Sequence, residues 1–197
     1  MSTDPETLAV YGAQAQAYAD MTEGLDGDKH LAAFIAAMPQ GARVLDLGCG
    51  PGRAAGQMAD RAFVVDAVDA VPEMVDMAAM HPGVTAWQAS FDDIGGVGIY
   101  DGIWANFSLL HAPREALPGH LTALKQALKP GGLFHIGMKT GTGEERDKIG
   151  RLYTYYTEDE LRALLTAAGL APAASWHGRD KGLSGELSDW VVIHAHG

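Results

Sequence analysis

The sequence predicts an α/β fold with a doubly wound, mostly parallel sheet. Two observations support this expectation. Strand-like and helix-like segments alternate along the chain, which is typical of parallel sheets with crossover helices. The apolar run 43–47 also passes through a glycine-rich turn into a helix-like stretch, and this is how such sheets form a nucleotide crevice. The chain has 197 residues, 47% of them hydrophobic, so we expect residues 1–197 to form a single domain.

Seven strands are expected, each a short apolar run between turn residues. They span residues 43–47, 62–68, 84–87, 100–105, 131–138, 171–177 and 188–195. Helices are expected at residues 52–60, 72–80, 117–128 and 157–168. Thr157 and Glu160 form a capping box at the start of the last helix, and Gly169 ends it. The run 129–132, Lys-Pro-Gly-Gly, is expected to turn from a helix into the fifth strand.

Two segments stand apart from this alternation. Residues 1–40 contain two alanine-rich stretches, 5–20 and 28–38, and they predict a helical cap before the first strand. Residues 139–156 are polar and glycine-rich and contain three tyrosines. Because the fifth strand delivers this segment to the carboxyl edge of the sheet, where α/β ligands bind, we expect a lid-like insertion over the site. The alternative is a surface loop whose tyrosines pack on the last helix.

Composition limits the classes of partner. The formal charge is −11, with 25 acidic and 14 basic residues, and nucleic-acid binders normally carry a basic face, so no nucleic-acid partner is expected. The single cysteine, Cys49, excludes an internal disulfide and a cysteine-based zinc cluster. No window reaches a membrane-spanning length and residues 1–20 lack a signal pattern, so we expect a cytoplasmic protein without a membrane partner. No convincing set of metal ligands stands out, so no metal is expected.

The turn after the first strand is the most informative motif. Asp46 is followed by Gly48, Gly50 and Gly52, which makes an acidic residue followed by Gly-x-Gly-x-Gly. Glycine lets a ligand approach the backbone, and a carboxylate suits a cationic amine but repels a pyrophosphate. A dinucleotide site needs Gly-x-Gly-x-x-Gly. The chain lacks this pattern in either register, because arginine or alanine stands where the third glycine would be.

The motif resembles motif I of the class I S-adenosylmethionine (SAM) dependent methyltransferases. The resemblance covers residues 40–170 and is strongest to small members similar to those of ubiquinone biosynthesis. It implies the Rossmann-like methyltransferase fold, in which an antiparallel last strand inserts between the fifth and sixth. It also implies SAM as the cofactor and a small molecule as the methyl acceptor.

A carboxylate about 20 residues past the glycine turn is placed to accept both ribose hydroxyls. Asp69 ends the second strand at that point, and the resemblance assigns it this role. Ala70 would lie beside it, with Val71 and Met74 against the adenine. Asp66, inside the same strand, is the competing acid. A helix-capping role for Asp69 is compatible with ribose binding.

After the third strand, members of this family usually have an acid that accepts from the adenine amino group. Ser90 stands at that position here. We therefore expect Ser90 and Phe91 to contribute backbone and stacking contacts. Asp92 and Asp93 are either part of this site or solvated turn acids.

The segment 100–111 resembles motif IV of the family, beside the methionine half of SAM. The resemblance places Asn106 at the sulfonium side. His111 is expected near the transferred methyl, either as a general base or as a residue that packs or orients the acceptor. Methyl transfer from a sulfonium is an in-line displacement, so positioning is expected to be the main catalytic device.

The helical cap and the insertion supply further candidates. The resemblance implies that the helix carrying Tyr11 and Tyr18 folds over the cofactor, although both tyrosines are equally compatible with ordinary packing. Arg53 is expected to meet a carboxylate or to stay exposed. Arg146 and Arg151 are expected to grip an aromatic or acidic acceptor. Histidines in the last part of the sheet are expected to have structural rather than metal-binding roles: His135, His194 and His196. The full set of expected cofactor contacts is Asp46, Gly48, Cys49, Gly50, Asp69, Ala70, Ser90, Phe91, Asn106 and Tyr18.

Two other functions remain open from the sequence. A non-catalytic SAM-binding protein would keep the same motifs, and only turnover would distinguish it from an enzyme. A NAD(P)-binding oxidoreductase would leave Asp46 without a use and would need the glycine pattern that the chain lacks.

Overall fold

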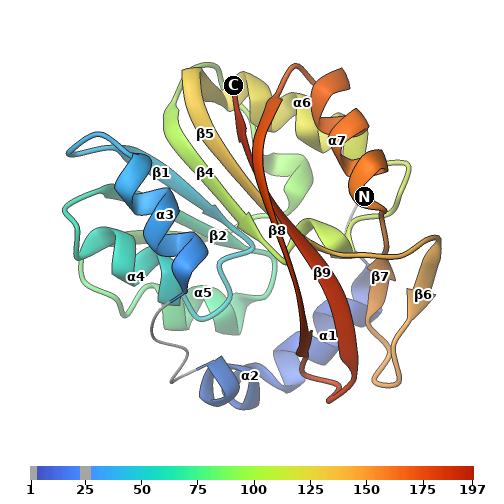
Figure 1. Ribbon diagram of the computed structural model, residues 1–197. Coiled ribbons are helices and arrows are strands. Elements are labelled where there is room, and N and C mark those ends of the chain that lie inside the picture. The colour runs from blue at the N-terminus through green and yellow to red at the C-terminus, as the bar shows by residue number, and fades with distance from the viewer. Residues whose placement is uncertain (1–3, 23–27) are drawn as a thin grey trace.

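One sheet with strand order β3-β2-β1-β4-β5-β9-β8 forms the centre of the fold (Figure 1). The computed structural model describes residues 4–22 and 28–197. The sheet strands are β1 (Arg43–Leu47), β2 (Val64–Asp69), β3 (Val84–Gln88), β4 (Tyr100–Asn106), β5 (Leu128–Lys139), β8 (Ala171–Lys181) and β9 (Leu187–His196). β1 to β5 pair in parallel, whereas β9 is antiparallel to both β5 and β8. The seven-stranded, mostly parallel sheet and the inserted last strand are therefore confirmed.

Helices cover both faces of the sheet. They are α1 (Pro5–Ala13), α2 (Ala15–Thr22), α3 (Lys29–Ala37), α4 (Arg53–Ala59), α5 (Pro72–Ala78), α6 (Leu117–Ala127) and α7 (Glu158–Ala167). Side chains alternate along β1, so that Val44 joins the core formed with α3 and α4, and Leu45 and Leu47 join the core formed with α6 and α7. Burial on both faces explains why the parallel strands read as nearly continuous apolar runs.

The N-terminal cap contains a break that the sequence analysis missed. The stretch 5–20 was expected to be one helix, but α1 ends at Ala13 and α2 begins at Ala15. Gln14 between them has φ −117° and ψ 19°, outside the helical region. Alanine content predicts helix along the whole stretch, and only tertiary packing selects the break.

β5 starts earlier than expected. The run 129–132 lies inside this strand instead of turning into it. Its pairing with β4 shifts between Tyr100, opposite Leu128, and Gly102, opposite Leu133. The extra residues on β5 form an irregularity in the ladder, which Gly131 accommodates with a φ of 76°.

Residues 139–156 form an antiparallel hairpin, β6 (Glu144–Arg146) and β7 (Leu152–Thr154). The hairpin lies beside α1, which it contacts through an Arg146–Asp4 ion pair of 2.8 Å (Figure 1). A 3-10 turn, η2 (Leu109–His111), follows β4 and packs near β7. No helix within residues 4–22 and 28–197 is long and apolar enough to cross a membrane.

Candidate functional site

A cleft lies at the carboxyl ends of the first four parallel strands. It has a volume of about 750 Å³, including its opening to solvent. Its floor comes from the loops after β1, β2, β3 and β4, and its roof from the cap helices α1 and α2. The lining residues are Asp4, Thr7, Leu8, Tyr11, Tyr18, Leu47, Gly48, Gly50, Asp69, Ala70, Val71, Met74, Ala89, Phe91, Asn106, Phe107, Ser108 and His111. β1 and β4 are adjacent and their connections run to opposite faces, which makes this the ligand-binding switch point of the sheet.

The glycine turn needs glycine at each of its three positions. Gly48, Gly50 and Gly52 have φ values of 69°, 53° and 81°, in the left-handed region. A Cβ on Gly48 would stand 2.3 Å from Cβ of Ser108, and one on Gly52 would stand 2.5 Å from Cα of Ala78. The turn is therefore packed against both the β4 loop and α5, which brings backbone close to the cleft.

Asp69 and Asp66 are separated clearly by the structure. Asp69 lines the cleft and accepts backbone N–H bonds of 2.9 Å from Gly50 and from Val71. Burial raises the pKa of Asp69, and these two hydrogen bonds oppose the shift. Asp66 does not line the cleft and instead accepts from the Arg43 guanidinium at 2.8 and 2.9 Å. Only Asp69 is placed to receive ligand hydroxyls.

Asp46 lies at the bottom of an adjoining cavity that also reaches Arg53, Gln57 and Asn106. The side chain is buried, and its Oδ2 atom has no hydrogen-bond partner among the described residues. Burial raises the pKa of Asp46 to about 7. A buried carboxylate oxygen without a partner fits a cationic ligand group, which would complete its interactions.

The adenine end of the expected site needs one correction. Ala89 and Phe91 line the cleft, but Ser90 does not. The Ser90 amide and hydroxyl both donate to Asp93, at 2.8 and 2.7 Å, in a capping box that starts the turn Phe91–Asp93. Both Ser90 donors are thus satisfied inside the turn, which a single sequence does not reveal.

Two other expected contacts lie deeper than the cleft surface. Cys49 faces the adjoining cavity, is 9% exposed and packs in the core formed with α3 and α4. Burial raises the pKa of its thiol, so a packing role fits better than a reactive one. Arg53 also faces that cavity, and it donates to the backbone oxygen of Thr22 in the cap.

Asn106 lines both cavities at the end of β4. Its Oδ1 atom accepts from Nε2 of His135 at 3.0 Å, and Nδ1 of His135 is 3.0 Å from Nε2 of His194. Burial lowers the pKa of both histidines, so this chain of side chains is uncharged. The structural role expected for His135 is in keeping with this arrangement, which orients the Asn106 amide.

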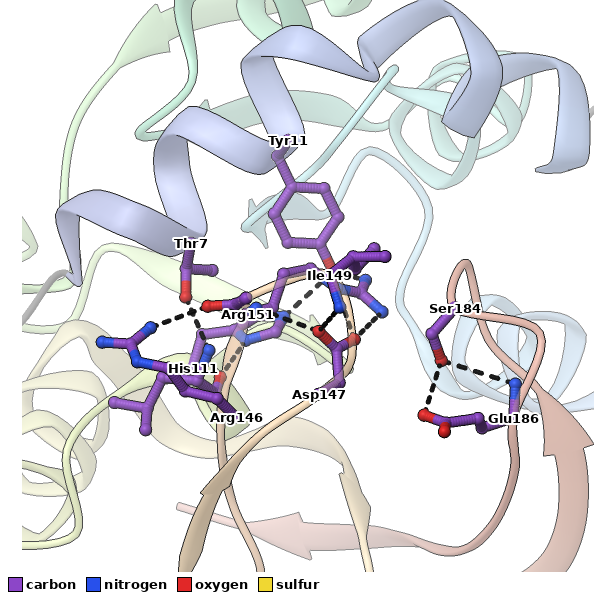
Figure 2. Close-up of polar contacts among 11 residues, drawn as sticks. Thr7, Tyr11, His111, Arg146, Asp147, Ile149, Arg151, Ser184 and Glu186 are labelled. Carbon is purple, nitrogen blue, oxygen red and sulfur yellow. Dashed lines mark hydrogen bonds and ion pairs between the residues drawn. The ribbon is translucent and has the colours of Figure 1, made fainter.

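His111 lines the cleft as the last residue of η2. Its Nδ1 is 2.6 Å from the Leu152 carbonyl of β7, and its Nε2 is 3.0 Å from the Tyr11 hydroxyl of α1 (Figure 2). Burial lowers the pKa of His111 to about 4. The residue is therefore a neutral imidazole near pH 7, held by both the cap and the hairpin.

The two arginines of the hairpin do not line the cleft, contrary to the expectation that they grip an acceptor. Arg146 pairs with Asp4 at 2.8 Å and with Glu6 at 3.2 Å. Arg151 is 1% exposed and pairs with Asp147 at 2.7 Å. A buried arginine such as Arg151 needs a partner of this kind, and Asp147 provides it.

Several residues of the cleft were not singled out in the sequence analysis, among them Leu8 and, within the segment 100–111, Phe107 and Ser108. Phe107 follows β4 with a φ of 54°, unusual for a bulky residue, and lines the cleft. Ser108 is buried, and its hydroxyl has no hydrogen-bond partner within the described part of the chain. Leu8 closes the roof from α1. Their position just after a strand end, or on a cap helix, is the one general indication that was available.

Metal ligands are not gathered in the described ranges, where no group of three or more His, Cys, Asp or Glu side chains is close enough to hold an ion. That no metal is needed remains a prediction. The geometry instead defines a class of protein: an α/β protein with a ligand cleft at the carboxyl edge of its sheet, where one carboxylate is held by backbone N–H groups and a second, buried carboxylate has an oxygen without a partner among the described residues.

Comparisons with known proteins are consistent with this class. A family model described as a methyltransferase domain matches residues 44–132. A ubiquinone biosynthesis O-methyltransferase of Xanthomonas axonopodis pv. citri is 34% identical over 162 residues, which cover 78% of this chain and 62% of the relative. The chain thus spans about three fifths of the length of this curated relative.

Solved structures show the same fold. The 1,6-didemethyltoxoflavin-N1-methyltransferase of Burkholderia thailandensis, solved with 1,6-didemethyltoxoflavin and S-adenosylhomocysteine, superposes with a TM-score of 0.73 at 26% identity. The match covers 100% of this chain and 91% of that one. A SAM-dependent methyltransferase of Methanosarcina mazei gives a TM-score of 0.74 at 17% identity, covering 87% of this chain and 98% of that one. This chain is thus similar to SAM-dependent methyltransferases in both sequence and fold, and one of these structures was solved with S-adenosylhomocysteine bound.

Proposed function

We propose that this chain transfers the methyl group of SAM to a small-molecule acceptor bound under α1. The observation that carries the proposal is the pair of carboxylates at the strand ends: Asp69 with backbone-oriented oxygens, and Asp46 with a buried oxygen that lacks a partner among the described residues. Asp69 would accept from the ribose hydroxyls and Asp46 would face the methionine ammonium. Phe91 and Met74 would border the adenine.

When bound, SAM supplies an electrophilic methyl group on a sulfonium, which an acceptor displaces in line. The chain contributes orientation and exclusion of water, because α1 and α2 close over the cleft and bring Thr7, Leu8, Tyr11 and Tyr18 to its lining. One similar protein is named an O-methyltransferase and the other an N1-methyltransferase. Both names support a small-molecule acceptor, with His111 beside it as the titratable group.

Binding and turnover test the proposal separately. Calorimetry should show SAM and S-adenosylhomocysteine binding, whereas NADH should not bind. Incubation with SAM and candidate acceptors should then release S-adenosylhomocysteine. Binding of NADH alone would overturn the assignment, and SAM binding without turnover on any acceptor would favour the non-catalytic alternative.

Binding of SAM is expected to release a proton from Asp46. The folded-state pKa of Asp46 is raised from 3.8 to about 7, so the ligand-free protein loses stability as the pH rises between these values. A cation beside the carboxyl would lower that pKa and expel the proton. Calorimetry at pH 6, in buffers of different ionisation enthalpy, should show close to one proton released. The proton release should become small by pH 8.5 and should be absent in Asp46→Asn. An unchanged proton release in that variant would show that Asp46 is not the group that loses the proton when SAM binds.

The hairpin is proposed to act as a lid through its hold on α1. Replacing residues 140–147 with a Gly-Ser linker removes Arg146 and Asp147, and with them the ion pairs to Asp4 and Arg151. SAM affinity should stay within a few-fold, while acceptor turnover falls strongly. Arg146→Ala, which breaks the contacts to Asp4 and Glu6 and the hydrogen bond to the Gly150 carbonyl, should shift turnover in the same direction. Unchanged turnover in both variants would show that the hairpin is a passive surface element.

A further inference from the structure

The basic nitrogen of His111 is covered by a tyrosine. Nε2 of His111 is 3.0 Å from the hydroxyl of Tyr11, and Nη1 of Arg151 donates to the same hydroxyl at 2.7 Å (Figure 2). Tyr11 and His111 both line the cleft, whereas Arg151 lies behind them. Tyr11 therefore stands between the histidine and the arginine at the wall of the site.

The direction of each hydrogen bond follows from the partners. Nδ1 of His111 faces the Leu152 carbonyl at 2.6 Å, and a carbonyl can only accept, so Nδ1 carries the proton of the neutral ring. Nε2 is then bare and accepts from the Tyr11 hydroxyl. Arg151 can only donate, so it occupies one lone pair of the Tyr11 oxygen. The Tyr153 side chain also hydrogen-bonds with the Tyr11 hydroxyl, so a donor group in the cleft would share or take over that position on the oxygen.

Charge around Tyr11 selects against a cationic acceptor. The guanidinium of Arg151 lies 5.0 Å from the Tyr11 ring centroid and 5.1 Å from that of Tyr153. Lys139 places its Nζ 3.7 Å from the Tyr153 ring. Asp147 neutralises Arg151 from the side away from Tyr11, through bonds of 2.7 and 3.0 Å. The nearest charge to the Tyr11 oxygen is therefore positive, which repels an ammonium group and favours negative charge that develops on that oxygen.

We propose that Tyr11 is a catalytic residue that takes a proton from an uncharged acceptor, a hydroxyl or a ring N–H, and passes its own proton to His111. The proposal rests on the methyltransferase function given above. The acceptor atom forms its bond to the methyl carbon as the carbon–sulfur bond breaks, with that electron pair going to sulfur. The acceptor proton moves to the Tyr11 oxygen, and the Tyr11 proton moves to Nε2 of His111. The products are the methylated acceptor, the neutral thioether and an imidazolium.

Because the protons move only as the methyl group is transferred, a weakly basic histidine can serve as the final proton acceptor. A neutral hydroxyl or ring N–H is too weak an acid to protonate such an imidazole before reaction. The same group becomes strongly acidic once the methyl group is being transferred and positive charge appears on the acceptor atom. His111 thus stays neutral until the proton must leave, and Arg151 stabilises the Tyr11 oxygen while its proton moves.

The hydrogen bond itself can be tested without turnover. Nitrogen-15 NMR of the histidine side chains should show His111 as the Nδ1–H tautomer, with an Nε2 signal that changes in Tyr11→Phe. Tyr155→Phe is the matched control. It also removes one tyrosine hydroxyl, but Tyr155 lies in the hairpin segment 139–156 and does not line the cleft. An Nε2–H tautomer in the unaltered protein would overturn the proposed direction of transfer.

Kinetics with a set of phenols tests the proton transfer. The probes are phenols that are un-ionised at pH 7.5, nitrophenols that are already ionised, a ring N–H heterocycle and benzylammonium. Tyr11→Phe and His111→Asn should lower turnover of the un-ionised probes by roughly 100- to 10,000-fold. Turnover of the ionised nitrophenols should change only a few-fold, because no proton remains to be removed.

The following kinetic results would contradict the proposed proton transfer through Tyr11. Equal losses for ionised and un-ionised phenols would show that Tyr11 only supports the fold. Methylation of benzylammonium alone, or of none of the probes, would overturn the acceptor class. Calorimetry with S-adenosylhomocysteine and turnover of the unaltered protein on any acceptor separate these results from a failure of the proposed function, since that failure removes cofactor binding or turnover in the unaltered protein, whereas a failure of the Tyr11 proposal leaves both intact.

Discussion

Replacing Gly50 with valine is expected to abolish SAM binding. Gly50 has a φ of 53°, where a β-branched residue is strained by about 1–3 kcal/mol. A Cβ at this position would lie 3.4 Å from Cε1 of Tyr18, and the two methyl groups beyond it would enter the cleft. The Gly50 amide also donates to Asp69, so a shift of the turn would disturb the ribose carboxylate. Calorimetry should detect no SAM binding up to millimolar concentrations.

Gly41→Ala provides the matched control for backbone strain. Gly41 has a φ of 71°, but a Cβ there would have no neighbour within 4 Å, and it lies before β1 at the opposite edge of the sheet from the cleft. This variant should lose some thermal stability and keep its SAM affinity. Equal loss of binding in both variants would mean that the effect comes from the fold and not from the site.

Asp69→Ala is expected to weaken SAM binding much more than Asp66→Ala. A hydrogen bond to a charged group contributes roughly 1.5–3 kcal/mol, so each lost ribose contact should cost on the order of tenfold to a hundredfold in affinity. Asp66→Ala removes the ion pair with Arg43, which is half exposed and remote from the cleft. It should lower stability slightly and leave the affinity within about threefold.

Dissociation constants for SAM from both aspartate variants, measured beside thermal unfolding curves, decide between the two acids. Asp69→Asn adds a useful comparison, because it keeps the size of the side chain and one acceptor oxygen while removing the charge. Equal or reversed losses for Asp66 and Asp69 would show that the ribose lies elsewhere along β2.

The succession of strands along the chain and the floor of the cleft were accessible from the sequence because they follow from local rules, whereas the insertion of the last strand between the fifth and sixth was implied only by the family resemblance. Asp69 and Asn106 are the last residues of β2 and β4, and parallel strands bring their carboxyl ends to one edge. The glycine turn gave the third point of the floor. The alternation of strands and helices was enough to place Asp69, Asn106 and the glycine turn at one edge of the sheet, so no tertiary contact had to be known to predict the floor of the cleft.

The roof and wall of the site depend on contacts between distant parts of the chain. Tyr11 and His111 are 100 positions apart, and Tyr11 and Arg151 are 140 apart, yet they share one hydrogen-bond network. Periodicity does not encode which cap residue meets which hairpin residue. Ser90 failed as an expected contact for a related reason, because its neighbour Asp93 competes for the same donors.

The place of β9 in the sheet has a consequence for the order in which the molecule assembles. β1 to β5 can pair with one another once residues 43–139 are available, but β8 has its sheet pairing with β9 alone among the described strands. β8 can therefore join the sheet only after residues 187–196 are available, and until then one edge of β5 is unpaired. Pairing between strands that are distant in sequence slows folding, and an unpaired strand edge is prone to aggregate. A nascent chain of this protein should therefore bind chaperones that cover unpaired strands.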